Sequence, residues 1–179
     1  MVTATKPVTA GGIAVAPAGT TLPTNATTAL ASDYVRLGYV SEDGVVRSTS
    51  IDSTEFKDWS GKTVYVATTS RDDEFTFTLI DSDKPEVMKL AVGDANVTGS
   101  LAEGIVAKVD SSELEDHVFV IDMILAEGVA KRIVIPNGKV TAIGDISYTS
   151  KDAVGYELTV KAQVDDAGYS VYEYTQASA

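Results

Sequence analysis

The chain has 179 residues, of which 44% are hydrophobic, and this is enough for one domain with a core of its own. Its 14 basic and 26 acidic residues give a formal net charge of −12, which disfavours a general attraction to nucleic-acid phosphates. The absence of cysteine excludes disulfide scaffolds and thiolate metal sites.

The first residues contain no apolar run of signal-peptide length, and no segment approaches the ~20 apolar residues needed to cross a bilayer. We therefore expect a protein made in the cytoplasm, with no membrane partner. Residues 13–30, IAVAPAGTTLPTNATTAL, carry little charge, two prolines and no sustained helical or strand period. They are predicted to form an extended arm without a core, and disorder is the alternative interpretation.

Short apolar segments after the arm predict strands. Residues 36–40 and 45–51 flank Asp43-Gly44, a strong hairpin-turn signal because this pair tolerates positive φ. Residues 62–70 and 74–80 follow, with Phe75, Phe77 and Leu79 alternating with threonines. The charged run at 71–74 is expected to connect these two strands.

One helix is predicted within residues 81–93. Ser82 or Asp83 is placed to cap it, Pro85 fits the first turn, and Gly93 is suited to end it. Val87, Leu90 and Ala91 share one face. A helix of about nine residues needs a sheet to lie on.

Strand signals resume after the helix. Apolar segments are separated by turn residues at 136–138 and by Asp165-Asp166-Ala167-Gly168, and Gly144 indicates a bulge or a close approach. The expected strands lie at residues 104–110, 117–126, 129–136, 139–149, 156–164 and 169–175. About nine or ten strands and one helix predict a mainly β fold, an antiparallel sandwich or flattened barrel with a short flanking helix. The expected organisation is an arm over residues 1–35, a β domain over 36–175 and a tail over 176–179.

Catalytic and metal-binding motifs are weak. His117 is the only histidine, and it begins an apolar strand with no nucleophile motif beside it. The acids fall mostly in expected turns, where solvation is the simplest interpretation, although a hydrolytic carboxylate pair stays open from residues alone. We expect no enzyme activity, no cofactor and no metal.

The connector at residues 52–61, DSTEFKDWSG, is unusual. It is longer than a tight hairpin needs, and it holds Phe56 and Trp59, the only tryptophan. Aromatic side chains in such loops either fold back on their own core or anchor an interface.

The order of many weak features resembles the major tail protein, or tail tube protein, of siphophages, especially those infecting actinobacteria. The features are the Ala/Pro-rich arm, LGYVSEDGV, the DWSG loop, the helix, and the PNGKV and DDAG turns. The resemblance runs from Gly12 to Tyr174 and is least clear over residues 96–116.

The resemblance implies a structural virion protein of the tail-tube fold. Its hexameric rings stack into a tube around a tape measure protein, between tail terminator and distal tail proteins, and DNA passes through the lumen without specific binding. Carried over by position, it assigns a ring-stacking loop to Asp52, Glu55, Phe56, Lys57, Asp58 and Trp59. It assigns an assembly arm to Ile13, Val15, Pro17, Leu22, Pro23 and Leu30. An arm without its own core would become ordered on a neighbouring copy.

The acidic charge suggests a lumen that repels phosphates, and Asp72, Asp73 and Glu74, or the outward face around Arg47, are the expected lumen residues. The main alternative is a monomeric β-sandwich adhesion or decoration module of a virion, in which the arm is a linker. A second alternative is a carboxylate hydrolase on a β scaffold, and a third is the tube of a contractile or secretion machine with the same fold.

Overall fold

A computed structural model describes residues 6–7, 12–151 and 153–177. The first strands are β1 (Lys6–Pro7), β2 (Ile13–Pro17), β3 (Val35–Arg36), β4 (Val40–Lys57) and β5 (Thr63–Leu79). The helix α1 (Pro85–Val92) and the 3-10 turn η1 (Asp94–Asn96) lead into β6 (Val97–Ser100) and β7 (Gly104–Ala107). The remaining elements are β8 (His117–Ile124), η2 (Ala126–Gly128), β9 (Val129–Ile143), β10 (Tyr156–Gln163) and β11 (Tyr172–Ala177).

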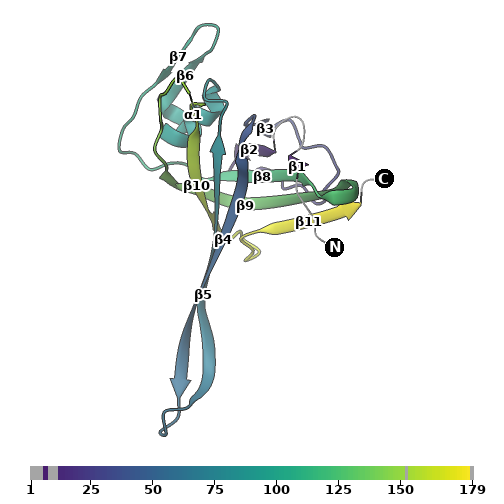
Figure 1. The fold of residues 1–179 in the computed structure, drawn as a ribbon, viewed down its shortest axis with the longest axis vertical. Helices are drawn as coiled ribbons and strands as arrows, with labels where there is room; N and C mark the ends of the chain where they lie inside the picture. The colour runs from purple at the N-terminus through teal and green to yellow at the C-terminus, as the bar shows by residue number, and fades with distance from the viewer. Residues whose placement is uncertain (1–5, 8–11, 152, 178–179) are drawn as a thin grey trace.

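Nine of the strands form one large antiparallel sheet in the order β3-β2-β8-β9-β10-β5-β4, with β1 added to β8 and β11 added to β9, and β6 pairs with β7 in a separate small sheet. The path is open at both ends, so the sheet is bent rather than closed into a barrel. Strands β8, β9 and β11 cross the half that contains β4, β5 and β10, as Figure 1 shows. The predicted mainly β, antiparallel, sandwich-like class with one helix is confirmed.

The bend is made in β9. Its first half pairs with β8 and β11, and its second half pairs with β10. The β8 register breaks between His117 and Phe119 opposite this point, and a Cβ on Gly138 would lie 2.5 Å from the Phe119 ring. Only glycine fits this close approach. The expected turn at 136–138 is therefore wrong, because the segment continues β9 through an irregularity.

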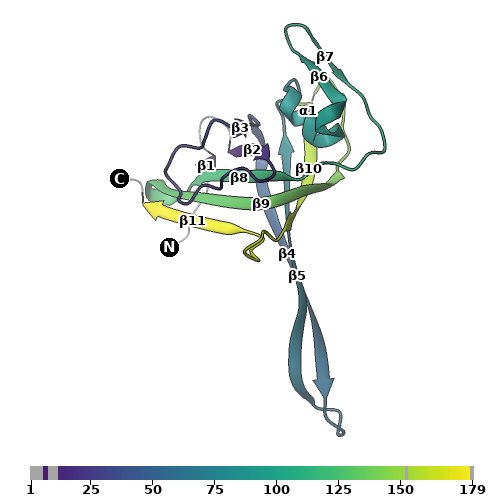
Figure 2. The same cartoon turned by 180° about the vertical axis from the view of Figure 1, so that it is seen from behind.

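The main core lies between the two halves of the bent sheet, and α1 covers its open side (Figure 2). Phe75, Phe77 and Leu79 point into it, as their alternation predicted. The helix begins at Pro85 and buries Val87, Leu90 and Ala91, which confirms the prediction. Its N-cap residue is Lys84 rather than Ser82 or Asp83, and it makes no side-chain capping bond.

A second core lies on the other face of β2, β8 and β9. Its buried residues are Ala14, Ala16, Tyr34, Val118, Val120 and Val134, and Leu22, Leu30, Tyr172 and Tyr174 pack against them. Residues 18–34 thus cover the face of their own sheet. The prediction of an arm over residues 1–35, outside the β domain, is wrong for residues 13–35, which belong to the folded unit.

Two further turn predictions are wrong, because long-range pairing overrides local turn preference. Asp43-Gly44 does not close a hairpin: β4 runs through it, with a register irregularity between Val40 and Val45. The expected connector at 71–74 lies inside β5. The turn at Asp165 is present, but β10 and β11 both pair with β9 rather than with each other.

Candidate assembly surface

The largest feature outside the cores is the free half of the β4–β5 hairpin. Its ladder runs from the pair Ile51 and Arg71 to the pair Lys57 and Thr63, and the ribbon projects away from the sheet (Figure 1). The connector predicted at 52–61 is thus the end of a hairpin rather than a loop, since residues 52–57 are strand. Its exposed large apolar residues are Ile51, Phe56, Trp59, Val64, Tyr65 and Val66.

The two faces of the projecting hairpin differ. Phe56 and Tyr65 are cross-strand partners with ring centroids 5.9 Å apart. Glu55 and Lys57 alternate with Phe56 along β4 and therefore point to the opposite face, where the Glu55 carboxylate accepts from the Thr63 hydroxyl. One face thus carries the aromatic pair, and the other carries charges together with the exposed Val66, the cross-strand partner of Glu55. Exposure of an aromatic pair to water is energetically unfavourable in the monomer. Exposed aromatic side chains of this kind are typical of interface anchors.

A rigid turn presents Trp59 at the hairpin tip. The Asp58 Oδ1 accepts from the Ser60 hydroxyl at 2.7 Å and from the Lys62 amide at 2.9 Å. These hydrogen bonds hold the pKa of Asp58 below its ordinary value. The Trp59 side chain has no cover from its own chain, with a relative exposure of 106%. The alternative that Trp59 folds back on the core is therefore not seen.

The hairpin is anchored where it leaves the sheet. Arg47 Nη2 lies 3.0 Å from Asp73 Oδ1, and the Thr49 hydroxyl donates to the same oxygen at 2.5 Å. Arg47 also pairs with Glu173 of β11, which Lys131 of β9 contacts at 2.8 Å. The Arg47 guanidinium lies over the Phe75 ring, 5.4 Å from its centroid. This cluster ties four strands, β4, β5, β9 and β11, together at the hairpin base.

Strand alternation places the three acids expected at a lumen on two different faces of β5. Asp73 points toward the core side with Phe75 and is buried, whereas Asp72 and Glu74 point to the opposite, half-exposed face. That face is polar: Lys161 pairs with Asp72 at 3.2 Å, and the Thr76 and Thr159 hydroxyls lie 3.2 Å apart. We call it the polar sheet face, defined by Ser48, Asp72, Glu74, Thr76, Thr159 and Lys161.

The expected assembly-arm residues are not equivalent. Ile13 and Val15 are buried in the main core, whereas Pro17 is exposed at the end of β2. Leu22, Pro23 and Leu30 are half-buried, and the two leucines pack on the second core. Ile13 and Val15 therefore have no surface to offer a neighbouring copy.

A buried ion cluster holds this segment down. Arg132 Nε lies 2.6 Å from Asp122 Oδ1, and Arg36 Nη2 lies 2.7 Å from Asp122 Oδ2. Arg132 Nη1 also donates to the backbone oxygens of Asn25 and Thr28 at 3.0 and 2.9 Å. Sequence reasoning missed this cluster, because its members are far apart in the chain and each is an ordinary charged residue.

His117 is buried at the start of β8, where its Nε2 lies 3.2 Å from the Asp94 carboxylate and its Nδ1 lies 3.2 Å from the Glu115 carbonyl oxygen. This is a strand-end position that links β8 to η1. Within the described ranges, no group of three His, Cys, Asp or Glu residues is arranged to hold a metal ion. None of the helices in that part of the chain has the length and apolarity required to span a bilayer.

A bent antiparallel sheet with a projecting hairpin and exposed aromatic residues is typical of a protein that contacts other chains. The family model described as "Phage tail tube protein" matches residues 6–178. The chain therefore belongs to the phage tail tube protein family and is a virion structural component.

Two further comparisons add context. A solved structure described as "Cryo-EM structure of the anti-feeding prophage cap (AFP tube terminating cap)" is similar at 13% identity, with a TM-score of 0.49. The match covers 95% of this chain and 92% of that one. Among curated proteins, none matches the sequence.

Proposed function

We propose that this protein self-assembles into hexameric rings that stack into the tail tube of a siphophage and conduct DNA during ejection. The observation that carries the proposal is the projecting β4–β5 hairpin, which exposes Phe56, Trp59 and Tyr65 far from its own cores. A monomer that functions alone gains nothing from such a ribbon, whereas a tube needs a contact that repeats along its axis.

Ring formation would use the edges of the bent sheet. β4 is the last strand of the sheet, and within the described part of the chain no strand pairs with its outer edge. Exposed edges of this length invite pairing with another chain. Closing a ring of copies removes these edges, while the hairpin contacts the next ring, so the two interfaces together give a tube.

The polar sheet face is our candidate for the lumen wall. It carries two acids, Asp72 and Glu74, and one cation, Lys161, among hydroxyl groups, on a chain of net charge −12. A wall of this sign repels phosphates and lets DNA slide. Because the buried Asp73 points the other way, we assign the lumen role to Asp72 and Glu74 alone.

The proposal includes a non-enzymatic role and the partners expected for a tail tube: a tape measure protein inside, and tail terminator and distal tail proteins at the ends. The domain organisation that fits it is one folded unit from residue 12 to 177, with the hairpin as its assembly element. Synthesis in the host cytoplasm precedes incorporation into the virion.

Electron microscopy with light scattering tests the proposal. The purified protein is imaged in negative stain at graded concentrations, with and without the tape measure protein. Hollow tubes or stacked rings of uniform diameter that increase with concentration support it. Monomeric particles at every concentration and with the tape measure protein present would contradict it and favour the adhesion module.

A further inference from the structure

The end of the molecule opposite the hairpin tip also exposes apolar residues. β6 and β7 form a separate two-stranded sheet beside α1, at the far end of the long axis from the tip (Figure 1). Leu101, Val106 and Val109 are 68%, 52% and 82% exposed there. We call this region, with Glu103 and Asp110, the β6–β7 surface. Val106 lies on β7, Leu101 in the turn between the two strands and Val109 two residues after β7, so exposed aliphatic side chains occur along the whole β6–β7 hairpin.

We propose that the β6–β7 surface of one copy receives the hairpin tip of the next copy along the tube axis. This inference rests on the proposed function, and it names the surface that the tip contacts. The tip supplies aromatic side chains, and the β6–β7 surface supplies aliphatic ones. Packing Trp59 against Leu101, in the turn between β6 and β7, would bury apolar area from both copies.

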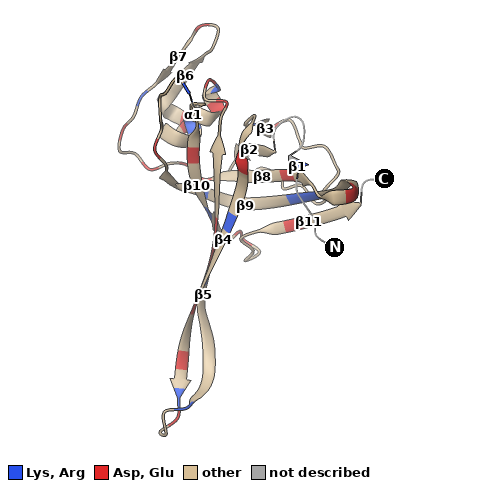
Figure 3. Ribbon diagram, in the orientation of Figure 1, with Lys and Arg blue, Asp and Glu red and all other residues tan. Residues whose placement is uncertain are grey.

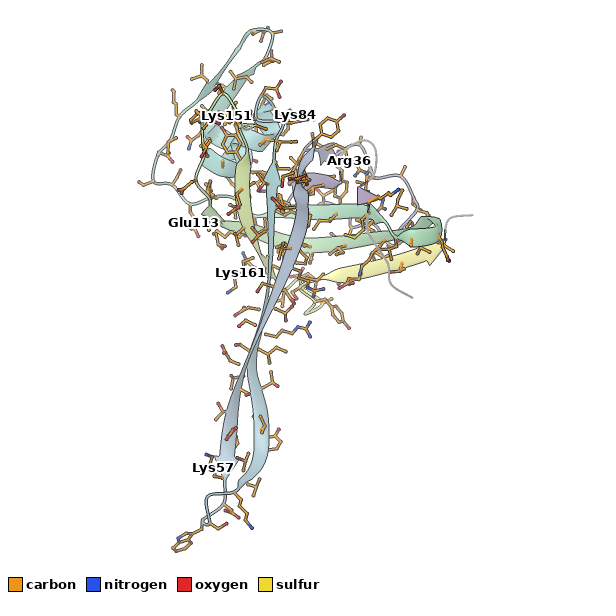
Figure 4. All side chains as sticks on the ribbon, viewed as in Figure 1. Arg36, Lys57, Lys84, Glu113, Lys151 and Lys161 are labelled. Carbon is orange, nitrogen blue, oxygen red and sulfur yellow. The ribbon has the colours of Figure 1, made fainter. Side chains whose placement is uncertain are left out.

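Charge distribution favours the same pairing. Residues 57–62 at the tip contain two lysines and one aspartate. The carboxylate of that aspartate is held by its own turn, and Lys57 lies 3.8 Å from the Glu55 carboxylate, so Lys62 is the tip cation without a partner among the described residues of its own chain. Residues 101–113 contain three carboxylates and one lysine. Asp110 accepts from Asn96 and Ser112, and Glu113 pairs with Lys139, so Glu103 is the acid that remains for Lys62 of the next copy. Figure 3 shows these charges at the two ends of the molecule, and Figure 4 labels Lys57 near the tip. Complementary charges orient such a contact.

The geometry also excludes a tip-to-tip contact as the growing interface. Two tips that pack on each other form a closed pair and juxtapose Lys57 and Lys62 with their copies. A tip that packs on a different surface leaves one free tip and one free receiving surface at each step. Only this second arrangement propagates, and the two surfaces lie at opposite ends of each subunit.

Disulfide trapping tests the contact directly, because the native chain has no cysteine. Ser60→Cys at the tip is combined with Ala102→Cys or with Ser111→Cys. The Ser60 change removes one hydroxyl bond to Asp58 but keeps Trp59 and the bond from the Lys62 amide to Asp58. Ser60→Cys with Val164→Cys, near the hairpin base, is the matched control. Two receiving positions are used because a disulfide forms only at Cα separations of about 4.4–6.8 Å.

Mild oxidation of assembled tubes should give a ladder of covalent multimers with the Ala102 or Ser111 partner and none with Val164. Tubes that give a ladder only with Val164, dimers with Ser60→Cys alone, or no ladder in any variant would overturn the β6–β7 assignment. Protein that never forms tubes would contradict the proposed function itself, so the two failures are distinguishable.

A charge exchange provides a second test. Lys57→Glu with Lys62→Glu should raise the concentration needed for assembly by about tenfold or more, because like charges would meet. Adding Glu103→Lys should restore assembly in part, whereas Asp166→Lys, an exposed acid elsewhere, should not. Equal rescue by both changes would show a net-charge effect and contradict the contact.

Discussion

Arg47 and Asp73 form an ion pair of 3.0 Å at the point where the projecting hairpin leaves the sheet. Asp73 is buried, and it also accepts from the Thr49 hydroxyl. Asp73→Ala should destabilise the protein by about 1–3 kcal/mol, because Arg47 and Thr49 lose their shared acceptor. Asp72→Ala on the half-exposed face should cost at most about 1 kcal/mol. Urea unfolding of both variants measures the difference, and equal losses would contradict a special role for Asp73.

The same pair predicts an effect of pH. Burial raises the pKa of Asp73, but hydrogen bonds from Thr49 and Arg47 outweigh it, so the pKa is lowered in the folded state. The ionised carboxylate therefore contributes stability above its unfolded pKa of about 3.9, and this is lost as pH falls through the folded pKa. The stability difference between the native chain and Asp73→Asn should shrink below about pH 4. Urea midpoints from pH 3 to 7 check this; a constant difference would contradict it.

The buried ion cluster around Arg132 should hold residues 18–32 on the sheet. Arg132→Met leaves Asp122 with Arg36 alone and frees the carbonyls of Asn25 and Thr28. We expect a loss of about 3 kcal/mol and faster proteolysis within residues 18–32. Lys131→Met, next in sequence but half-exposed, should cost at most about 1 kcal/mol and leave the cleavage rate unchanged. Similar proteolysis of both variants would show that Arg132 does not secure the segment.

The projecting hairpin should be required for assembly and dispensable for folding. Replacing residues 51–71 by Asn-Gly joins Ser50 to Asp72, which are already paired across the two strands. Asn-Gly suits a two-residue hairpin turn, so the domain should keep its circular dichroism spectrum. Electron microscopy should then show no tubes. Normal tubes from this shortened chain would remove the hairpin from the assembly mechanism.

The lumen assignment predicts an effect on DNA passage. Phage carrying Asp72→Lys with Glu74→Lys should assemble tails but eject DNA more slowly, because cations on the wall attract phosphates. Glu42→Lys with Asp166→Lys changes the net charge equally without touching the polar sheet face. Ejection is followed by DNA release in vitro, with tail length checked by microscopy. The same rate in both variants would place Asp72 and Glu74 outside the lumen.

The sequence predicted what depends on local signals. Pro85 and Gly93 mark the two ends of the helix, and the alternation from Phe75 to Leu79 indicates which face of β5 is buried. Both features are predictable because these patterns act within a few residues. The hairpin turn predicted at Asp43-Gly44 is wrong, since turn preference is local and the pairing of β4 with β5 overrides it. The sequence of Ile13–Ala16 predicts an arm rather than a strand, because a strand buried on both faces shows no alternation of apolar and polar residues.

The sequence predicts which residues belong to the candidate site, but it does not predict which way their side chains face. Phe56 and Trp59 stood out because aromatic residues are unusual in a polar connector. Which of Asp72, Asp73 and Glu74 faces the core depends on register with β4 and β10, and register is a long-range property. No sequence pattern predicts the β6–β7 surface. Leu101, Val106 and Val109 are distinguished only by their exposure at the end of the folded molecule opposite the hairpin tip.

The continuity of β4 and β5 has a mechanical consequence. The same two backbones form part of the domain core and the whole of the projection, and each runs as one strand through the register irregularities between Asp52 and Ser53 and between Phe56 and Lys57. A load applied at Trp59 is carried along two hydrogen-bonded strands and reaches the sheet as shear on the β5–β10 ladder. Each subunit would thus move as a rigid body. Bending of the assembled tail would then occur at the contacts between subunits rather than within a subunit.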